Sequence, residues 1–216
     1  MSGDAEISFR QQWLEENERA LTLGLLSEIE TAEAATQRSV ATRLGVALGL
    51  VNTYLKRCIR KGLIKIEQVP TKRYAYYLTG QGFAEKSRLV TEYLSYSLSF
   101  FRAARAEYGA IFETCLREGT SQVVLVGTGE LAEIALLSAR ESGIALEAVF
   151  APHGAMESFH GLPVFTDPAQ VAGRVMVMAD HVAPQASFDL VMAKASPCQV
   201  YAPPLMRLSA HRETAQ

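Results

Sequence analysis

The sequence lacks the features that define several large classes of protein. No apolar run approaches the roughly 18 residues that a membrane-spanning helix needs, and residues 1–10 contain no apolar segment of a secretion signal. The three cysteines, Cys58, Cys115 and Cys198, are far apart and form no CxxC pair. This spacing disfavours a disulfide scaffold and a zinc site, and it is typical of proteins in the reducing cytoplasm. We therefore expect a cytoplasmic protein that does not contact a membrane.

Common catalytic motifs are also missing. The chain has no G-x-S-x-G, H-E-x-x-H or G-x-x-x-x-G-K-[ST] pattern. Ser196-Pro197-Cys198 contains a thiol, but the sequence pairs it with no base. Fewer than a hundred residues follow Glu118, which leaves no room for the substrate domain of a hydride-transfer enzyme. We therefore expect a protein that is not an enzyme, and a small nucleotide-dependent enzyme ranks third among the alternatives.

The composition is that of a globular protein, and the basic residues are concentrated in one segment. Apolar residues make up 49% of the 216 residues and charged residues 20%, which indicates one or two domains. Residues 36–73 hold nine Lys and Arg and one acid, Glu67, within a chain of net charge −2. Such a block is typical of a surface that meets a polyanion. Alternatively, it is a solvated face balanced by nearby acids such as Glu28, Glu30 and Glu33.

The order of expected elements in this part of the chain has a specific use. Apolar spacing predicts helix over 5–34, in two pieces, followed by two shorter helices over 40–44 and 47–61. Gly45 suits a turn between the last two, and two short strands follow around the basic turn Pro70–Arg73. A helix fits the major groove of B-DNA, the preceding helix braces the backbone, and a basic hairpin reaches phosphates or the minor groove. We predict a winged helix-turn-helix domain over residues 1–82 that binds double-stranded DNA.

The helix over 47–61 and the hairpin tip carry the chemistry that DNA contact requires. Asn52 can hydrogen-bond a base edge, and Lys56 and Arg57 can neutralise phosphates or reach guanine. The candidate DNA-binding residues are Gln37, Ser39, Gly49, Asn52, Thr53, Lys56, Arg57, Arg60, Lys72 and Arg73.

Several of these segments resemble one family. The run from Gln37 to Asn52, QRSVATRLGVALGLVN, resembles the helix-turn-helix of MarR-type winged-helix regulators. Residues 63–66 and 74–82 resemble their wing and its LTxxG exit, and the following EKSRL at 85–89 is most similar to the exopolysaccharide-associated subgroup. The resemblance implies DNA binding as a dimer. A winged helix used for protein contact is the alternative.

A long helix is predicted over residues 83–118, and it carries two apolar rows. They are Leu94, Leu98, Phe101, Tyr108, Phe112 and Cys115, and Leu89, Tyr93, Tyr96 and Phe100. Two rows exceed what packing against one small domain requires, so we expect this helix to connect the halves of the chain and to form the seam of a homodimer. The alternative is that both rows are core within one chain.

Strands alternate with helices after Gly119, which predicts a parallel sheet covered on both faces. The whole chain is thus expected to be an α+β winged helix-turn-helix, a connecting helix, and an α/β Rossmann-like open parallel sheet over 119–208, followed by a polar tail over 209–216. The pattern G-x-G-x-x-A from Gly127 to Ala132 follows a strand and opens a helix, as in phosphate-binding turns.

This turn predicts a site for an anion such as pyrophosphate, as carried by a nucleotide-containing ligand. The candidate ligand-binding residues are Gly127, Thr128, Gly129, Glu130, Leu131, Ala151, Pro152 and His153. NAD binding requires an acidic residue at the end of the second strand, and this sequence has none there. Rex-type repressors, which sense NADH, are similar in architecture. The N-terminal domains of nucleotide-sugar N-acyltransferases have a comparable VxGxGxxA start, with Leu125 here in place of the valine, and a GxPV turn similar to GLPV at 161–164. These resemblances imply a dinucleotide or a nucleotide sugar as the ligand.

Two alternatives to a ligand site remain at this end of the chain. The Rossmann-like half can serve only assembly or partner recruitment, which makes the chain a DNA-binding protein without an effector. His153, His160 and His181 are the residues of a conceivable metal site, but their spacing does not require one, and none is expected.

Overall fold

The computed structural model describes residues 3–31, 36–69, 73–152, 154, 156–195 and 199–209, with side chains at 17–31, 36–67 and from 74 onward within these ranges. The chain divides into two compact units, Met1–Ser97 and Leu98–Gln216. Helix α4 (Gly80–Arg117) contributes its first part to one unit and its second part to the other. The connecting segment expected over 83–118 is therefore shared between the units.

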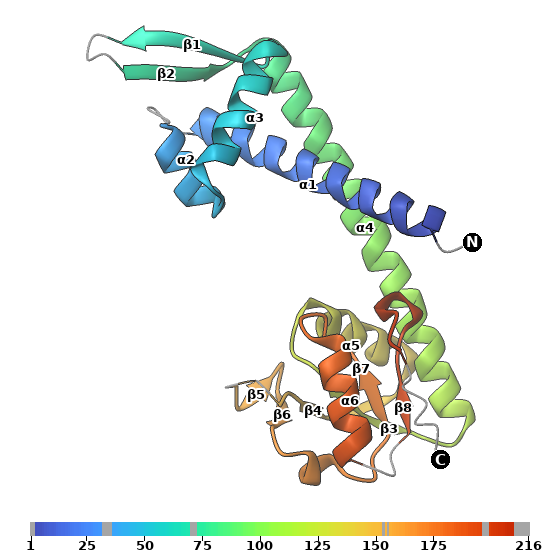
Figure 1. The fold of residues 1–216 in the computed structure, drawn as a ribbon. Helices are drawn as coiled ribbons and strands as arrows, with labels where there is room; N and C mark the ends of the chain where they lie inside the picture. Colours follow the sequence, from blue (N-terminus) through green and yellow to red (C-terminus); the bar gives the residue numbers. More distant parts are fainter. Residues whose placement is uncertain are drawn as a thin grey trace. The chain divides into compact units, whose positions relative to one another are not determined.

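The N-terminal unit is built from helices and one hairpin (Figure 1). Its elements are α1 (Gly3–Thr31), α2 (Gln37–Leu44), α3 (Leu48–Arg60), β1 (Ile64–Val69), β2 (Arg73–Leu78) and the start of α4. Strands β1 and β2 are antiparallel, with Ile64 opposite Leu78 and Val69 opposite Arg73. The expected helices and hairpin are present in this order, but the division of the first helical stretch into two pieces was wrong: α1 is one helix, and no proline interrupts it.

Both ends of α2 follow from the local sequence. Thr36 and Ser39 form a capping box at the start of α2, in which the Thr36 side chain accepts from the Ser39 N–H at 3.1 Å. Gly45 ends α2 in the left-handed region at φ 65°, where a side chain is disfavoured. The two helices then pack, with Leu25 and Leu26 of α1, around Val40, Val51 and Leu55.

The C-terminal unit contains a six-stranded sheet of order β5-β6-β4-β3-β7-β8. Its elements are β3 (Gln122–Val126), α5 (Glu130–Ser142), β4 (Ala145–Phe150), β5 (Ser158–Phe159), β6 (Leu162–Phe165), the 3-10 helix η1 (Pro168–Val171), β7 (Met176–Met178), α6 (Pro184–Lys194), β8 (Val200–Tyr201) and the 3-10 helix η2 (Pro204–Met206). All neighbouring strands are parallel except β5, which pairs antiparallel with β6.

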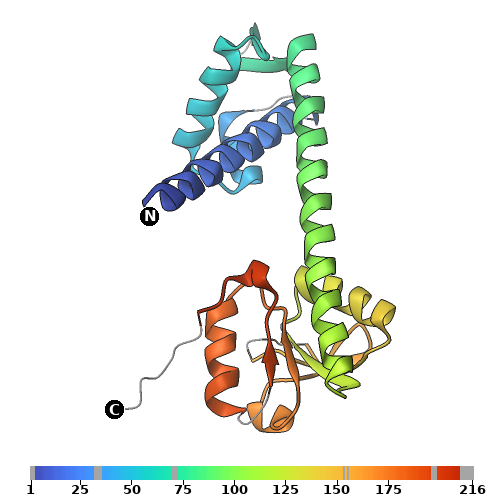
Figure 2. The ribbon, with the colours of Figure 1, turned by 90° about the vertical axis from the view of Figure 1, so that its right-hand side faces the viewer.

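Alternate residues of the central strand β3 belong to two different cores. Val123 and Leu125 pack with residues of α4 and α5, whereas Val124 and Val126 pack with residues of α6 and η1. Figure 2 shows α6 and the second part of α4 on opposite sides of the sheet. The unit therefore has three layers, with helices on both faces of the sheet, because successive side chains of a strand point to opposite faces.

The structure divides the two apolar rows of α4 differently from the prediction. Leu89 is core in the N-terminal unit, and Tyr108, Phe112 and Cys115 are core in the C-terminal unit, so these four do not form a free seam. Between them, five side chains of the two rows are exposed: Tyr93, Leu94, Tyr96, Leu98 and Phe100. Sequence spacing alone could not separate these groups, because both have the same helical period.

Smaller differences concern the ends of elements. Helix α6 begins at Pro184, four residues before the expected start at Phe188, because proline is well suited to the first turn of a helix. Strand β5 was not expected, since two residues carry no periodic signal.

Candidate functional site

One face of α3 gathers five of the six candidate residues on that helix. Their spacing of four, three and four residues places Gly49, Thr53, Lys56 and Arg60 on one stripe, with Asn52 beside it. We call these five residues the α3 stripe. The opposite face buries Val51, Leu55 and Cys58 in the core of the N-terminal unit.

The α3 stripe is accessible and basic. A Cβ at Gly49 would meet no atom within 4 Å, so a binding partner can approach the backbone of α3 closely at this residue. Thr53 Oγ1 donates a hydrogen bond to the Gly49 carbonyl at 2.9 Å and keeps its acceptor capacity. Lys56 and Arg60 are exposed, and neither forms an ion pair with any side chain that the structure describes. The stripe thus combines close approach, hydrogen bonding and positive charge.

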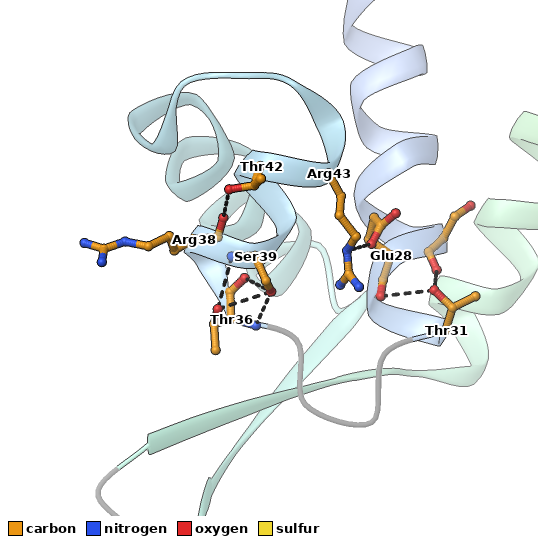
Figure 3. A network of polar contacts seen from close by, with 8 residues as sticks. Glu28, Thr31, Thr36, Arg38, Ser39, Thr42 and Arg43 are labelled. Atoms are coloured by element: carbon orange, nitrogen blue, oxygen red, sulfur yellow. Dashed lines mark hydrogen bonds and ion pairs between the residues drawn. The ribbon is translucent and has the colours of Figure 1, made fainter.

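Arg57, the sixth candidate on α3, lies outside this stripe. Its guanidinium forms an ion pair with Glu18 of α1. Arg43 of α2 likewise forms an ion pair with Glu28 of α1 (Figure 3). Acids of α1 therefore balance part of the basic segment, as one of the two interpretations of its charge requires. The other part, which includes Lys56 and Arg60, is not balanced in this way.

Arg38 is a basic residue of α2 that the candidate set omitted. Figure 3 shows its guanidinium pointing away from α1, in contrast to that of Arg43. Arg38 is exposed and has no ion pair within the described part of the chain. It lies in the basic segment, but the charge count could not distinguish it from its paired neighbours.

Gln37 and Ser39, the candidates in α2, support the fold. Gln37 Nε2 donates to the Tyr76 hydroxyl of β2 at 3.1 Å, which ties the start of α2 to the hairpin. The Ser39 hydroxyl accepts from the Thr36 N–H at 3.1 Å, which is one bond of the capping box, and donates to the Thr36 carbonyl at 2.9 Å (Figure 3). Gln37 thus ties α2 to the hairpin, and Ser39 stabilises the first turn of α2.

The hairpin carries one described basic side chain. Lys65 Nζ lies 2.7 Å from Glu67 Oε1 and 5.3 Å from the centre of the Tyr77 ring. The hydrogen bond with Glu67 raises the pKa of Lys65. Lys72 lies outside the described residues, and the structure describes only the backbone of Arg73. Ile66, Tyr74 and Tyr77 are exposed apolar residues of the hairpin.

In the C-terminal unit, the candidate turn after β3 lies against the loop after β7. Gly127 has φ +114°, and a Cβ there would stand 2.6 Å from Asp180 Cα. A Cβ at Gly129 would stand 2.1 Å from His181 Cε1. His181 Nε2 in turn lies 3.0 Å from Glu130 Oε2. Both glycines are thus required by contacts within the protein, and the imidazole of His181 occupies the approach to Gly129.

Asp180 organises the loop that carries His181. Its Oδ1 accepts from the N–H groups of Val182 and Ala183 at 2.9 and 3.2 Å, and its Oδ2 accepts from Ser187 Oγ at 2.5 Å. Burial acts to raise the pKa of Asp180, but these hydrogen bonds favour the carboxylate, and the net result is a lowered pKa. The ionised carboxylate therefore fixes the start of α6.

The remaining ligand candidates divide by burial. Leu131 and Ala151 are buried, Thr128 and Pro152 are half-buried, and His153 lies outside the described residues. His160 Nε2 lies 3.2 Å from Glu133 Oε1. His160 and His181 thus have different glutamate partners, and no group of three potential metal ligands occurs among the described residues.

Comparison with known proteins identifies the N-terminal part of the chain. Residues 18–65 match the family of winged helix-turn-helix DNA-binding domains. No curated protein matches the chain. A solved structure of a protein with unknown function from Listeria innocua Clip11262 is similar over 41% of this chain and 71% of that one, with 22% identity and a TM-score of 0.30. So slight a likeness says nothing about function.

Residues 18–65 run from the second half of α1 through α2 and α3 into β1. The chain therefore contains a winged helix-turn-helix DNA-binding domain, which indicates a transcription regulator, and the α3 stripe lies within that domain. Across the described residues, no helix has both the length and the apolar character needed to cross a membrane.

Proposed function

We propose that the protein is a homodimeric, sequence-specific transcription regulator that reads double-stranded DNA with α3. The α3 stripe carries the proposal: it is accessible, basic and backed by core within a DNA-binding domain. Asn52 reads a base edge, Lys56 and Arg60 contact phosphates or guanine, and Thr53 bonds a base or phosphate. The resemblance of residues 37–52 to MarR-type regulators supports this assignment.

A second copy of the chain accounts for the exposed middle of α4. A single winged helix reads only a few base pairs, so two copies are needed for two half-sites. At 150–250 Å² per ring, the half-exposed rings of Tyr93, Tyr96 and Phe100 present roughly 300 Å² of apolar surface. Leu94 and Leu98 extend this surface, and a standard interface buries about 800 Å² on each partner.

The test combines binding-site selection with sedimentation. The full chain selects a consensus from random duplexes, and binding to it is measured by fluorescence anisotropy. A two-fold symmetric consensus and a sedimenting dimer are the expected results. Tyr96→Glu places a charge in the proposed interface and should yield monomers with weakened DNA binding, whereas Leu137→Glu changes an exposed leucine of α5 and should leave the dimer intact. A Tyr96→Glu dimer as stable as the parent would contradict the role of α4.

We further propose that the Rossmann-like C-terminal unit senses a nucleotide sugar or a dinucleotide. The strand order places β3 between β4 and β7, so the turn from Gly127 to Leu131 opens at the carboxyl edge of a parallel sheet, where such ligands bind. Bound pyrophosphate requires His181 to leave Gly129. The ligand acts on DNA affinity through its different affinities for two dimer geometries.

A specific observation favours the alternative that this unit serves only assembly. Contacts with Asp180 and His181 already explain why residues 127 and 129 are glycines. The carboxylate of Glu130 also lies beside the position where a phosphate would bind. In that case the glycine pattern results from packing between the turn after β3 and the loop after β7.

A thermal-shift assay distinguishes ligand sensing from assembly as the role of this unit. The parent chain and His181→Ala are screened against NADH, UDP-N-acetylglucosamine and acetyl-coenzyme A. Sensing predicts stabilisation by one of these, and tighter binding to His181→Ala because the imidazole no longer competes. Stabilisation of neither protein would favour assembly. Turnover of a stabilising ligand would instead favour the small nucleotide-dependent enzyme.

A further inference from the structure

A polar pocket lies behind α3, on the side away from the α3 stripe. It has a volume of about 240 Å³, and α1, α3 and α4 contribute to its walls within the N-terminal unit. The buried thiol-bearing residue Cys58 and the apolar side chains of Leu63 and Leu89 form part of the lining. The pocket therefore adjoins the core, and its charged walls are supported by buried residues.

The charged walls are predominantly basic. Four cationic side chains, those of Arg19, Arg57, Lys61 and Arg88, line the pocket together with two carboxylates, those of Glu18 and Glu85. Each carboxylate already has a cationic partner, since Glu18 pairs with Arg57 and Glu85 pairs with Arg88.

Arg88 also forms an ion pair with Glu92, on the next turn of α4 and outside the lining. With Glu92 included, these side chains comprise four cations and three carboxylates.

Lys61 is the wall residue whose charge is least compensated. It is exposed at the C-terminal end of α3, and no ion pair to it occurs among the described side chains. Its ammonium is close enough to Glu85 to contribute to the lowered pKa of that carboxyl, although the hydrogen bond from Arg88 contributes more. Arg57 faces the same pocket, held by Glu18.

We propose that this pocket binds a small anion bearing carboxylate or phosphate groups, which acts as an effector of the DNA-binding unit. At about 30 Å³ per water molecule in the liquid, 240 Å³ corresponds to roughly eight waters. An anion of about that many non-hydrogen atoms fits. One of its oxygens replaces Glu18 at the Arg57 guanidinium, which suits bidentate contact with carboxylate or phosphate, and another contacts the Lys61 ammonium.

The position of the pocket explains how such an anion would influence DNA. Arg57 and Lys61 each directly follow a residue of the α3 stripe, Lys56 and Arg60. Exchange of the Glu18 pair for a ligand alters the link between α1 and α3 and hence the orientation of that stripe. Only this coupling rests on the proposed function in DNA binding, since the anion site itself does not require it.

The experiment measures anion binding to the full chain in the absence of DNA. Succinate and inorganic phosphate are titrated calorimetrically, with sodium chloride added to hold the ionic strength constant. Three proteins are compared: the parent, Lys61→Gln in the pocket wall, and Lys56→Gln on the same helix outside the pocket. Circular dichroism and thermal unfolding establish that all three are folded, as expected for exposed residues.

The parent and Lys56→Gln should bind one of the two probes saturably and with equal affinity, and Lys61→Gln should bind it at least tenfold more weakly. Binding of succinate alone identifies a dicarboxylate ligand, and binding of phosphate identifies a phosphate group. Equal binding by all three proteins, or saturable binding of neither probe, would overturn the proposal. Failure of the DNA-binding proposal is recognised separately, because DNA affinity of the parent is measured on its own.

Discussion

The imidazole of His181 lies so close to Gly129 that a Cβ at residue 129 would stand 2.1 Å from its Cε1 and 2.4 Å from its Nδ1. Two residues earlier, a Cβ at Gly127 would meet backbone, at 2.6 Å from Asp180 Cα and 2.7 Å from Asp180 N. The two glycines of the turn therefore accommodate different neighbours. One faces a side chain that can rotate, and the other faces a chain segment that cannot move without disturbing β7.

Alanine at these two positions should have unequal costs. Gly127→Ala combines a backbone clash with φ +114° and should lower the free energy of unfolding by on the order of 3 kcal/mol or more. Gly129→Ala should cost about 1 kcal/mol, because rotation of the imidazole sacrifices only the partly exposed contact with Glu130. Urea denaturation of the full chain measures both.

The double variant Gly129→Ala/His181→Ala is the control for this comparison. If contact with His181 is the reason for glycine at 129, the double variant should be no less stable than His181→Ala alone. A full additive loss would show that the backbone at residue 129, and not the imidazole, excludes a side chain.

Neighbouring residues of α3 should differ in their effect on DNA binding. Lys56→Gln and Arg60→Gln should each weaken binding and reduce the slope of log affinity against log salt by about one unit, because each removes one phosphate contact. Arg57→Gln should leave that slope unchanged, since Glu18 already holds the guanidinium. Anisotropy titrations from low to physiological salt provide the slopes.

The comparison depends on folded variants, so thermal unfolding accompanies each titration. A reduced slope for Arg57→Gln equal to that for Lys56→Gln would mean that DNA displaces Glu18 and that Arg57 contacts phosphate after all.

The elements of the chain could be predicted from sequence wherever local signals were strong. Gly45 located the turn between α2 and α3, although α2 begins at Gln37, three residues before its expected start, and the apolar run of residues 122–126 located β3 with both ends correct. Strand β8 pairs with β7, whose residues lie 24 positions earlier in the chain, and local periodicity carries no information about such a partner. Strand β5 pairs with the nearby β6, but its two residues are too few to show an alternating pattern, so the sequence did not predict it.

The candidate site was predictable only in part, because sequence does not show which charges pair. Arg57 and Lys56 are adjacent in sequence and chemically similar, but helical geometry turns one toward Glu18 of α1 and leaves the other exposed. The same holds for the glycine turn. Its pattern predicts a phosphate-binding turn, but His181, 52 residues beyond Gly129 in the chain, occupies that approach. Long-range contacts of this kind decide how a motif is used.

Acid should destabilise the loop that holds His181. The pKa of Asp180 is lower in the folded protein than the ordinary value of 3.8 that applies to the unfolded chain. Between these two pKa values the unfolded chain therefore binds more protons at this residue than the folded protein does. Its contribution to stability is complete above the unfolded value and is lost as the pH falls through the lower folded value. Asp180→Asn should therefore be less stable than the parent near pH 7, by at most about 1 kcal/mol because the carboxylate is half-exposed.

The difference between the parent and Asp180→Asn should shrink as the pH falls below 3.8. Urea midpoints across this range measure it, with Asp189→Asn as a control on an exposed carboxylate of α6. A constant difference at all pH values would assign the loss to packing of the amide, not to the charge.

The first turn of α4 offers a matched pair of glycines that tests how the hairpin is anchored. A Cβ at Gly82 would stand 2.0 Å from the carbonyl oxygen of Leu63, which precedes β1, whereas a Cβ at Gly80 would meet nothing within 4 Å. The N–H of Gly82 also donates to Thr79 Oγ1 at 3.0 Å, and that hydroxyl bonds the carbonyl of Gly62 at 2.7 Å. The base of the hairpin is therefore held directly against α4.

Gly82→Ala should force α4 away from Leu63 and lower the free energy of unfolding of the N-terminal unit by on the order of 3 kcal/mol or more. Gly80→Ala should be neutral or stabilising by up to about 1 kcal/mol, because alanine is the better helix former. Differential scanning calorimetry of the full chain, with DNA anisotropy on the same samples, measures both effects. The two sites differ in whether a Cβ meets the Leu63 carbonyl. Equal melting temperatures for the two variants would therefore show that the contact between Gly82 and Leu63 does not anchor the hairpin.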